Sequence, residues 1–176
     1  MLVRAAFRLD IPECLALDGS YETDCVWQLE QREDEAGIAI TLRQVQLPHP
    51  VELSYPSPGS ELNGRWEQQA CVLVAEPEGR VRGFVDMSAY RDQGLGFVHN
   101  LVVDRSFRRR GLGTALARDA MRWARQRSLR GVMVAVQSKN HPAVQFCRQM
   151  GLRFCGFNDR YFVNRDIALF FAARLS

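Results

Sequence analysis

The 176-residue sequence lacks several features that would assign it to a specialised class of protein. No apolar run approaches the ~18 residues that a membrane-spanning helix needs. Residues 1–10 are too short and too interrupted by charge for a secretory signal, so we expect a cytoplasmic protein. The five cysteines are odd in number and none stand as Cys-x-x-Cys, so neither a disulfide framework nor a zinc site is indicated, and most thiols are expected to be buried.

A strong charge bias is also missing. The chain has 23 basic and 20 acidic residues, and a net charge of +3 does not by itself argue for a nucleic-acid or membrane partner. With 47% hydrophobic and 24% charged residues, the composition excludes a disordered or collagen-like chain. We expect one domain over residues 1–176, since globular domains commonly contain ~100–200 residues. The proline- and glycine-rich stretch 48–66 is too short to separate two domains and is predicted to be a surface insertion.

Hydrophobic patterning predicts an α/β fold. Strands are predicted at residues 3–6, 37–47, 71–75, 80–87, 97–103, 132–136, 152–157 and 167–175. Helices are predicted after a cap at Asp10 and at residues 21–32, 114–127 and 142–150. The order from residue 97 to residue 150 is therefore strand, helix, strand, helix.

The most specific string is Arg108-Arg-Arg-Gly-Leu-Gly113, which lies between a predicted strand and a helix that starts at Thr114. Gly111 and Gly113 allow backbone N–H groups to converge on a ligand, and the start of the helix favours a phosphate there. The string therefore predicts a pyrophosphate site. It is not a P-loop, because no Lys-Ser/Thr pair follows the glycines. It is not a dinucleotide-binding loop either, because Arg110 occupies the first glycine position and no acidic ribose partner follows the next strand.

This loop resembles the acetyl-coenzyme A (acetyl-CoA) signature of the GCN5-related N-acetyltransferases (GNAT), Arg/Gln-x-x-Gly-x-Gly/Ala. Residues 101–103 are similar to the family's strand that pairs with the pantetheine arm, and Asn140-x-x-Ala143-x-x-Phe146 is similar to its second motif. The resemblance covers about residues 70–157 and is strongest to streptothricin acetyltransferases and ribosomal-protein alanine acetyltransferases.

The resemblance implies the GNAT fold, a mixed and mostly antiparallel twisted sheet that splays at the coenzyme A site, with helices on both faces. It implies acetyl-CoA as cosubstrate and no metal. The cofactor-binding residues that it implies are Leu101, Val102, Val103, Arg108, Arg109, Arg110, Gly111, Leu112, Gly113, Thr114, Asn140 and Phe146.

The sequence departs from the family pattern at two catalytic positions. Cys147 stands where many members have a tyrosine that protonates the departing thiolate, and it is either a proton donor or a buried apolar thiol. Ala135 stands where alanine-acetyltransferase relatives have a glutamate base. Tyr161 and Phe162 lie where relatives carry aromatic residues that contact the acceptor. Tyr161 is a candidate proton donor, and the alternative is that both rings only pack.

His99 is the nearest substitute for the missing base. Strand alternation predicts that it shares a face with Leu101 and Val103, opposite to Asn100 and Val102. A histidine there has a pKa suited to deprotonating an ammonium through water. The alternative is a histidine whose hydrogen bonds are satisfied in the core.

Together these features predict an N-acetyltransferase that moves an acetyl group from acetyl-CoA to a primary amine of a small molecule or a protein N-terminus. The acidic residues between positions 22 and 35, in the expected second helix, favour a cationic acceptor. One alternative is an acyl-CoA-binding module that has lost catalysis. Another is nucleic-acid binding through the arginines between residues 105 and 130, although the aromatic interleaving that single strands need is missing. We expect no nucleic-acid or membrane partner, and the sequence leaves open whether the chain forms a homodimer.

Overall fold

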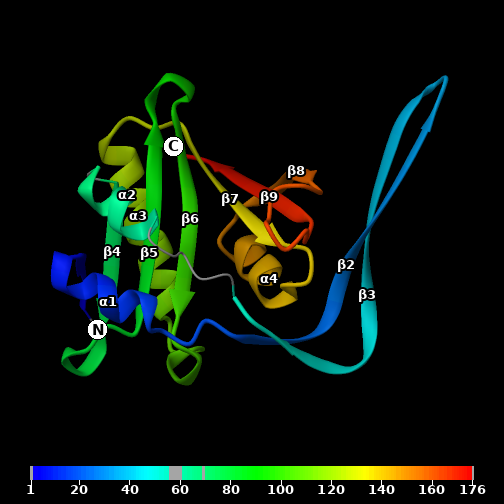
Figure 1. Ribbon diagram of the computed structural model, residues 1–176. Coiled ribbons are helices and arrows are strands. Elements are labelled where there is room, and N and C mark those ends of the chain that lie inside the picture. Colours follow the sequence, from blue (N-terminus) through cyan, green and yellow to red (C-terminus); the bar gives the residue numbers. More distant parts are fainter. Residues whose placement is uncertain (1, 56–60, 69, 176) are drawn as a thin grey trace.

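The computed structural model of the protein describes residues 2–55, 61–68 and 70–175. Its strands are β1 (Leu2–Ala5), β2 (Tyr21–Asp34), β3 (Gly37–Leu53), β4 (Cys71–Glu76), β5 (Gly83–Tyr90), β6 (Leu95–Val103), β7 (Gly131–Gln137), β8 (Arg153–Asn158) and β9 (Ala168–Arg174). Seven of them form one sheet in the order β1-β4-β5-β6-β7-β9-β8, while β2 and β3 form a separate sheet (Figure 1). Among the described strand pairs only β6 and β7 are parallel, so the predicted mixed, mostly antiparallel sheet is confirmed.

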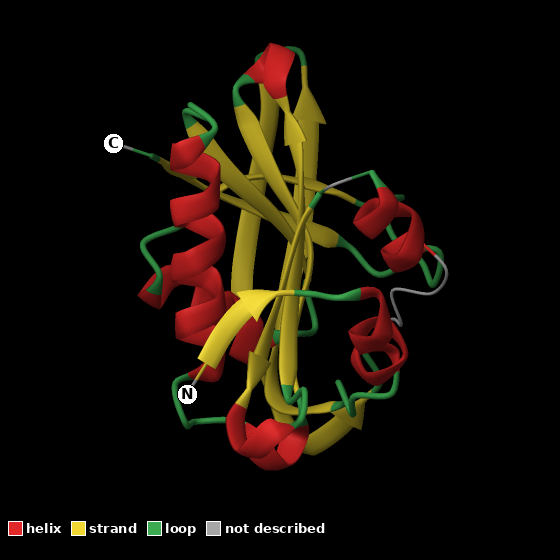
Figure 2. Ribbon diagram, turned by 90° about the vertical axis from the view of Figure 1, so that its left-hand side faces the viewer, coloured by secondary structure: helices red, strands yellow, loops and turns green. Residues whose placement is uncertain are grey.

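Helices cover both faces of the main sheet, as Figure 2 shows. They are α1 (Ile11–Leu15), α2 (Glu61–Glu67), α3 (Leu112–Gln126) and α4 (His141–Gln149). Ile11 of α1 and Leu62 of α2 pack in one buried cluster with Phe84 of β5. The helices α3 and α4 lie on the opposite face, where Leu116 and Val144 belong to two further clusters.

Residue spacing explains this two-sided packing. Leu112, Leu116, Ala120 and Ala124 recur every four residues along α3 and form its buried stripe. In β5, which is covered on both faces, every residue from Gly83 to Met87 is buried.

The strands β6 and β7 separate part-way along their length. Their register runs from Leu95↔Gly131 to Val98↔Val134 and no further, although β6 continues to Val103. From His99 onward, the edge of β6 that faces β7 therefore has no strand partner. This is the splay that the family resemblance implies.

The strands β2 and β3 pair from Tyr21↔Leu53 to Asp34↔Gly37 and form a hairpin arm that projects from the body beside α4 (Figure 1). The arm is attached at Trp27, whose Nε1 donates a hydrogen bond to His141 Nδ1 over 3.2 Å. The guanidinium of Arg148 lies 4.6 Å from the centroid of the Trp27 ring, on its face. Both of these contacts join the arm to α4.

Two predictions for this region are wrong. Residues 21–32 form β2 and not a helix, because Tyr21, Thr23 and Cys25 alternate with exposed residues and pair across the arm with β3. The stretch 48–66 is not simply a surface insertion, since β3 continues to Leu53 and α2 starts at Glu61. Residues 56–60 of that stretch lie outside the described residues.

Candidate functional site

The glycine-containing loop turns sharply between β6 and α3. Arg109 and Gly111 have positive φ values of 62° and 85°, and Gly111 is the N-cap of α3. The Arg108 side chain reaches back and donates from Nε to the carbonyl of Val103 over 3.1 Å. Partial burial lowers the pKa of Arg108. This side chain therefore fixes the loop to the end of β6, while the backbone N–H groups at the start of α3 have no helical acceptor.

A groove of about 470 Å³ lies against this loop. An added Cβ at Gly113 would stand 3.6 Å from Phe146 and 3.7 Å from Leu101, so the missing side chain leaves room for a slender ligand. The predicted residues that line the groove are Leu101, Val102, Val103, Arg108, Arg109, Gly111, Leu112, Gly113, Thr114, Asn140 and Phe146. Arg110 is not among them, and its guanidinium lies over the Phe107 ring, 4.8 Å from the centroid. Glycines, free amides and positive charge suit a pyrophosphate with a thin arm attached.

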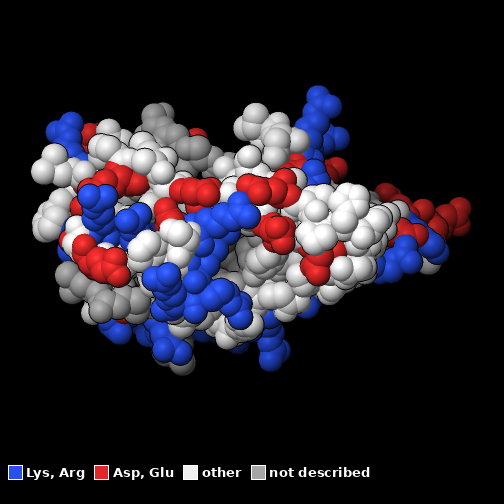
Figure 3. Space-filling view, turned by 90° about the horizontal axis from the view of Figure 1, so that it is seen from below, with Lys and Arg blue, Asp and Glu red and all other residues white. Residues whose placement is uncertain are grey.

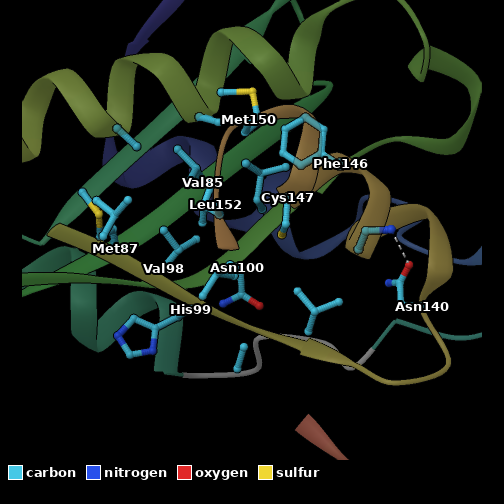
Figure 4. A pocket seen from close by; sticks show the side chains of 18 of the residues that line it. Val85, Met87, Val98, His99, Asn100, Asn140, Phe146, Cys147, Met150 and Leu152 are labelled. Carbon is cyan, nitrogen blue, oxygen red and sulfur yellow. Dashed lines mark hydrogen bonds between the residues drawn. The ribbon is translucent and has the colours of Figure 1, made fainter. Parts of the chain in front are cut away.

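Asn140 caps α4. Its Oδ1 accepts a hydrogen bond from the backbone N–H of Ala143 over 3.0 Å, drawn as a dashed line in Figure 4. The residue is nearly buried and borders the groove. It therefore has a structural role in addition to the predicted cofactor role.

A second cavity of about 430 Å³ opens where β6 and β7 diverge (Figure 4). It contacts all three predicted catalytic residues, His99, Cys147 and Tyr161. Five residues border both the groove and the cavity, namely Tyr55, Leu101, Asn140, Ala143 and Phe146. The two hollows thus meet at the splay, and a ligand on the glycine loop can extend toward His99.

The predicted orientation of His99 is wrong, because β6 contains a bulge at this residue. Asp86 pairs with Asn100 and Met87 with Val98, which leaves His99 without a partner on β5. Its Nε2 lies 2.9 Å from Ser88 Oγ, and Ser88 alternates with Asp86 along β5. His99 therefore lies on the face of Asp86, opposite to the α3 face. Burial and, next, the charge of Arg65 lower the pKa of His99, so the imidazole is neutral near pH 7.

The two other predicted catalytic side chains differ in character. Burial raises the pKa of the Cys147 thiol to about 12, which keeps it protonated. Tyr161 is half-exposed, and burial raises its pKa above the ordinary value. Its ring lies 6.5 Å from that of Phe97, which in turn lies 5.2 Å from the His99 ring. Phe97 is therefore in ring contact with both His99 and Tyr161.

A buried polar chain lies beside His99. The Asp86 side chain is fully buried, and its two oxygens accept hydrogen bonds from Arg65 Nε and from Asn100 Nδ2, the latter over 2.8 Å. Asn100 Oδ1 in turn accepts from the Tyr55 hydroxyl over 3.0 Å. Arg65 also reaches Glu61 at the cavity mouth, at 3.0 Å.

Comparison with known proteins agrees with this geometry. Residues 39–152 match the profile of the Acetyltransferase (GNAT) family. The chain belongs to the GNAT family of acetyltransferases. Streptothricin acetyltransferase of Streptomyces lavendulae is 26% identical over 147 residues, which make up 81% of this chain and 76% of that protein.

Solved structures extend the similarity to nearly the whole chain. The structure of nourseothricin acetyltransferase has a TM-score of 0.85 at 26% identity and covers 99% of this chain and 98% of its own. A candidate streptothricin acetyltransferase from Bacillus anthracis str. Ames, solved with acetyl coenzyme A, has a TM-score of 0.78 at 20% identity, with 98% of each chain covered. The GNAT fold binds acetyl-CoA.

Sequence reasoning missed four polar residues at the cavity. Tyr55, Arg65 and Asn100 line it, and the buried Asp86 accepts hydrogen bonds from Arg65 and Asn100. A signal was present for Asp86, since an aspartate inside the apolar run Gly83–Met87 needs a buried partner. No signal identified the partner, because Arg65 lies 21 positions away in another element.

The arginines between residues 105 and 130 do not form a single basic surface. Figure 3 views the end of the molecule where β6 leads into the glycine loop, and acidic side chains stand among the basic ones around a recess. Arg105 pairs with Glu52 over 2.8 Å, and Arg122 pairs with Asp119 over 2.7 Å. In the part of the chain that the structure describes, no helix is long and apolar enough to span a membrane. Nor do three or more potential metal ligands gather anywhere among these residues.

Proposed function

We propose that this acetyltransferase moves the acetyl group of acetyl-CoA to a primary amine of a small molecule or of a protein N-terminus. The observation that carries the proposal is the meeting of the two hollows at Tyr55, Leu101 and Phe146. One hollow begins at the glycine loop, and the other ends among His99, Tyr161 and Glu61. A donor and an acceptor entering from opposite ends would meet at the splay.

The glycine loop and the start of α3 would bind the pyrophosphate through backbone N–H groups from Arg109 to Thr114. Leu101 and Phe146 would contact the pantetheine arm, with Asn140 at the side of the slot. The unpaired edge of β6 beyond Val98 leaves backbone N–H groups free to hydrogen-bond to the arm or to an oxyanion.

Bound acetyl-CoA supplies a thioester whose carbonyl carbon a neutral amine can attack. A C–N bond forms, the C–S bond breaks with its electron pair going to sulfur, and the nitrogen loses one proton. Neutral His99 would accept that proton directly or through water. Cys147, whose pKa is raised to about 12, and Tyr161 are the side chains at the cavity that would return a proton to sulfur.

A panel of primary amines with acetyl-CoA, followed by thiol release, tests the proposal. We expect turnover in the parent and none in a Gly111→Val/Gly113→Val variant that still folds, because the added side chains would close the groove. Coenzyme A binding without turnover on any amine would instead support the alternative of a module that has lost catalysis. The reason to consider this alternative is that Ala135 and Cys147 replace the residue types expected at two catalytic positions.

Nucleic-acid binding through the arginines is tested by titration with DNA and RNA at several salt concentrations. Steeply salt-dependent binding would support it. The ion pairs of Arg105 and Arg122 argue against it.

A further inference from the structure

The chain of hydrogen bonds from Arg65 to Tyr55 has a defined direction. Arginine only donates, and Arg65 Nε faces one oxygen of Asp86. The other oxygen of Asp86 faces an N–H of Asn100 at 2.8 Å. Because both carboxylate oxygens accept, no proton on Asp86 is needed to satisfy the contacts, and Asp86 acts only as an acceptor.

This direction fixes the orientation of the next two groups. With its amino group on Asp86, Asn100 must present Oδ1 to Tyr55, so the Tyr55 hydroxyl donates its one hydrogen over 3.0 Å. The lone pairs of the Tyr55 oxygen are then free of that bond. A tyrosine hydroxyl held in this way offers an acceptor to a ligand and has no second proton to donate.

The position of Tyr55 is equally specific. It is one of the residues that border both the coenzyme A groove and the cavity of His99. Asn100, which accepts the hydrogen bond of the Tyr55 hydroxyl, directly follows the bulge at His99 in β6. Tyr55 therefore lies where the acetyl group and the acceptor would meet, if the proposed function is correct.

We propose that the Tyr55 hydroxyl oxygen accepts a hydrogen bond from the N–H of the acceptor amine and so orients the amine for attack. This proposal rests on the proposed function and deepens it. A neutral primary amine has two N–H groups and one lone pair. An N–H held by Tyr55 turns the lone pair away from the tyrosine and leaves it free for the thioester carbon. Asp86 and Asn100 are positioning residues that act through the direction of the Tyr55 hydrogen. Because the Asp86 charge also raises the pKa of His99, the variants are compared at pH 8, where His99 is neutral with or without that charge.

The experiment compares three single variants and one double variant by steady-state kinetics with both substrates varied. Tyr55→Phe keeps the ring and removes the oxygen. We expect kcat/KM for the amine to fall roughly tenfold, the worth of one hydrogen bond, while KM for acetyl-CoA stays within twofold. Tyr90→Phe is the matched control, because it removes the same atom from a half-exposed tyrosine outside both hollows, and it should behave as the parent.

Asp86→Asn tests the direction of the chain with Tyr55 still in place. An amide at position 86 that accepts from Arg65 presents its amino group to Asn100. Asn100 would then turn its own amino group toward Tyr55, and the tyrosine hydrogen would point into the slot. We expect the same loss for the amine as in Tyr55→Phe, and no further loss when the two changes are combined.

Several results would overturn the proposal. Unchanged amine kinetics in a folded Tyr55→Phe variant would show that Tyr55 only packs, and a rise confined to KM for acetyl-CoA would assign its oxygen to the pantetheine arm. Independent, additive losses in the double variant would show that Asp86 does not act through Tyr55. If Tyr55→Phe melts below the assay temperature, the comparison of Asp86→Asn with the parent decides alone. Full activity of Asp86→Asn on the amine would then count against the proposal. Failure of the proposed function is a different result, because the parent itself would then turn over no amine.

Discussion

Replacement of Gly113 by alanine should raise stability and keep cofactor affinity, because the family signature accepts glycine or alanine at this position, whereas replacement by valine should weaken coenzyme A binding. Gly113 is the second residue of α3 and has no positive φ, so alanine fits its backbone. A helical alanine is up to ~1 kcal/mol more stable than glycine, and half of that at the helix start raises the melting temperature by about 1–2 °C. The methyl group of alanine would stand 3.6 Å from Phe146 and 3.7 Å from Leu101, in ordinary contact with the protein, whereas the two further methyl groups of valine would extend into the groove.

The larger side chain of Gly113→Val would displace a pyrophosphate or pantetheine from the α3 amides. Loss of one charge-assisted hydrogen bond costs ~1.5–3 kcal/mol, which corresponds to a roughly 10- to 100-fold weaker coenzyme A complex. Calorimetric titration and thermal melts measure both effects. Gly64→Ala is the control, since an added Cβ in α2 meets nothing within 4 Å and should stabilise the protein without weakening the complex. Coenzyme A affinity equal to that of the parent in a folded Gly113→Val variant would refute the assignment of the groove.

Three further predictions use single side chains. Because burial and Arg65 lower the pKa of His99 from 6.5, the rate should rise with pH along a limb centred below 6.5, and His99→Gln should lose that limb while keeping coenzyme A affinity. Asn140→Ala should cost about 1 kcal/mol of stability, because a helix cap is lost, and it should also bind coenzyme A more weakly than the parent does. Unchanged coenzyme A affinity with lowered stability would leave Asn140 with the capping role alone. Cys147→Ser should retain most activity. A thiol reagent at pH 8 should label only Cys155 rapidly in the native protein, because Cys155 is the one exposed cysteine. Rapid labelling of Cys147 would contradict its burial.

The sequence predicted the fold best where local patterning and tertiary packing agree. The α3 stripe and the apolar run of β7 each carry one clear period, and both elements lie within a few residues of their predicted bounds. The β2 segment failed because its charged outer half is compatible with a helix, while its strand state depends on pairing with β3. That pairing is local only near the turn at Asp34↔Gly37, and at the base of the arm it joins residues as far apart as Tyr21 and Leu53.

The same distinction between local pattern and tertiary contact holds for the site. The glycine loop is contiguous in sequence, so its residues could be named together, and of the predicted loop residues only Arg110 does not line the groove. The orientation of His99 could not be predicted, since strict alternation fails at a bulge. The Asp86 chain depends on Arg65 and Tyr55, which reach the sheet only through the tertiary arrangement of α2 and the segment before it.

The electrostatics of the site finally predict a preference among amines. Asp86 is neutralised by Arg65, and His99 has a lowered pKa, so the site supplies only a weak base. A weak base cannot strip a strongly basic ammonium efficiently, and the acceptor must then arrive largely neutral. An α-amine with a pKa of ~8 is neutral roughly 200 times more often at pH 7 than an ε-amine with a pKa of ~10.4. We expect kcat/KM at pH 7 to favour the less basic amine of a size-matched pair by roughly 100-fold, with the ratio unchanged at pH 6 and shrinking above pH 8 as the less basic amine becomes fully neutral. Equal values at pH 7 would mean that a stronger base than His99 acts in this cavity.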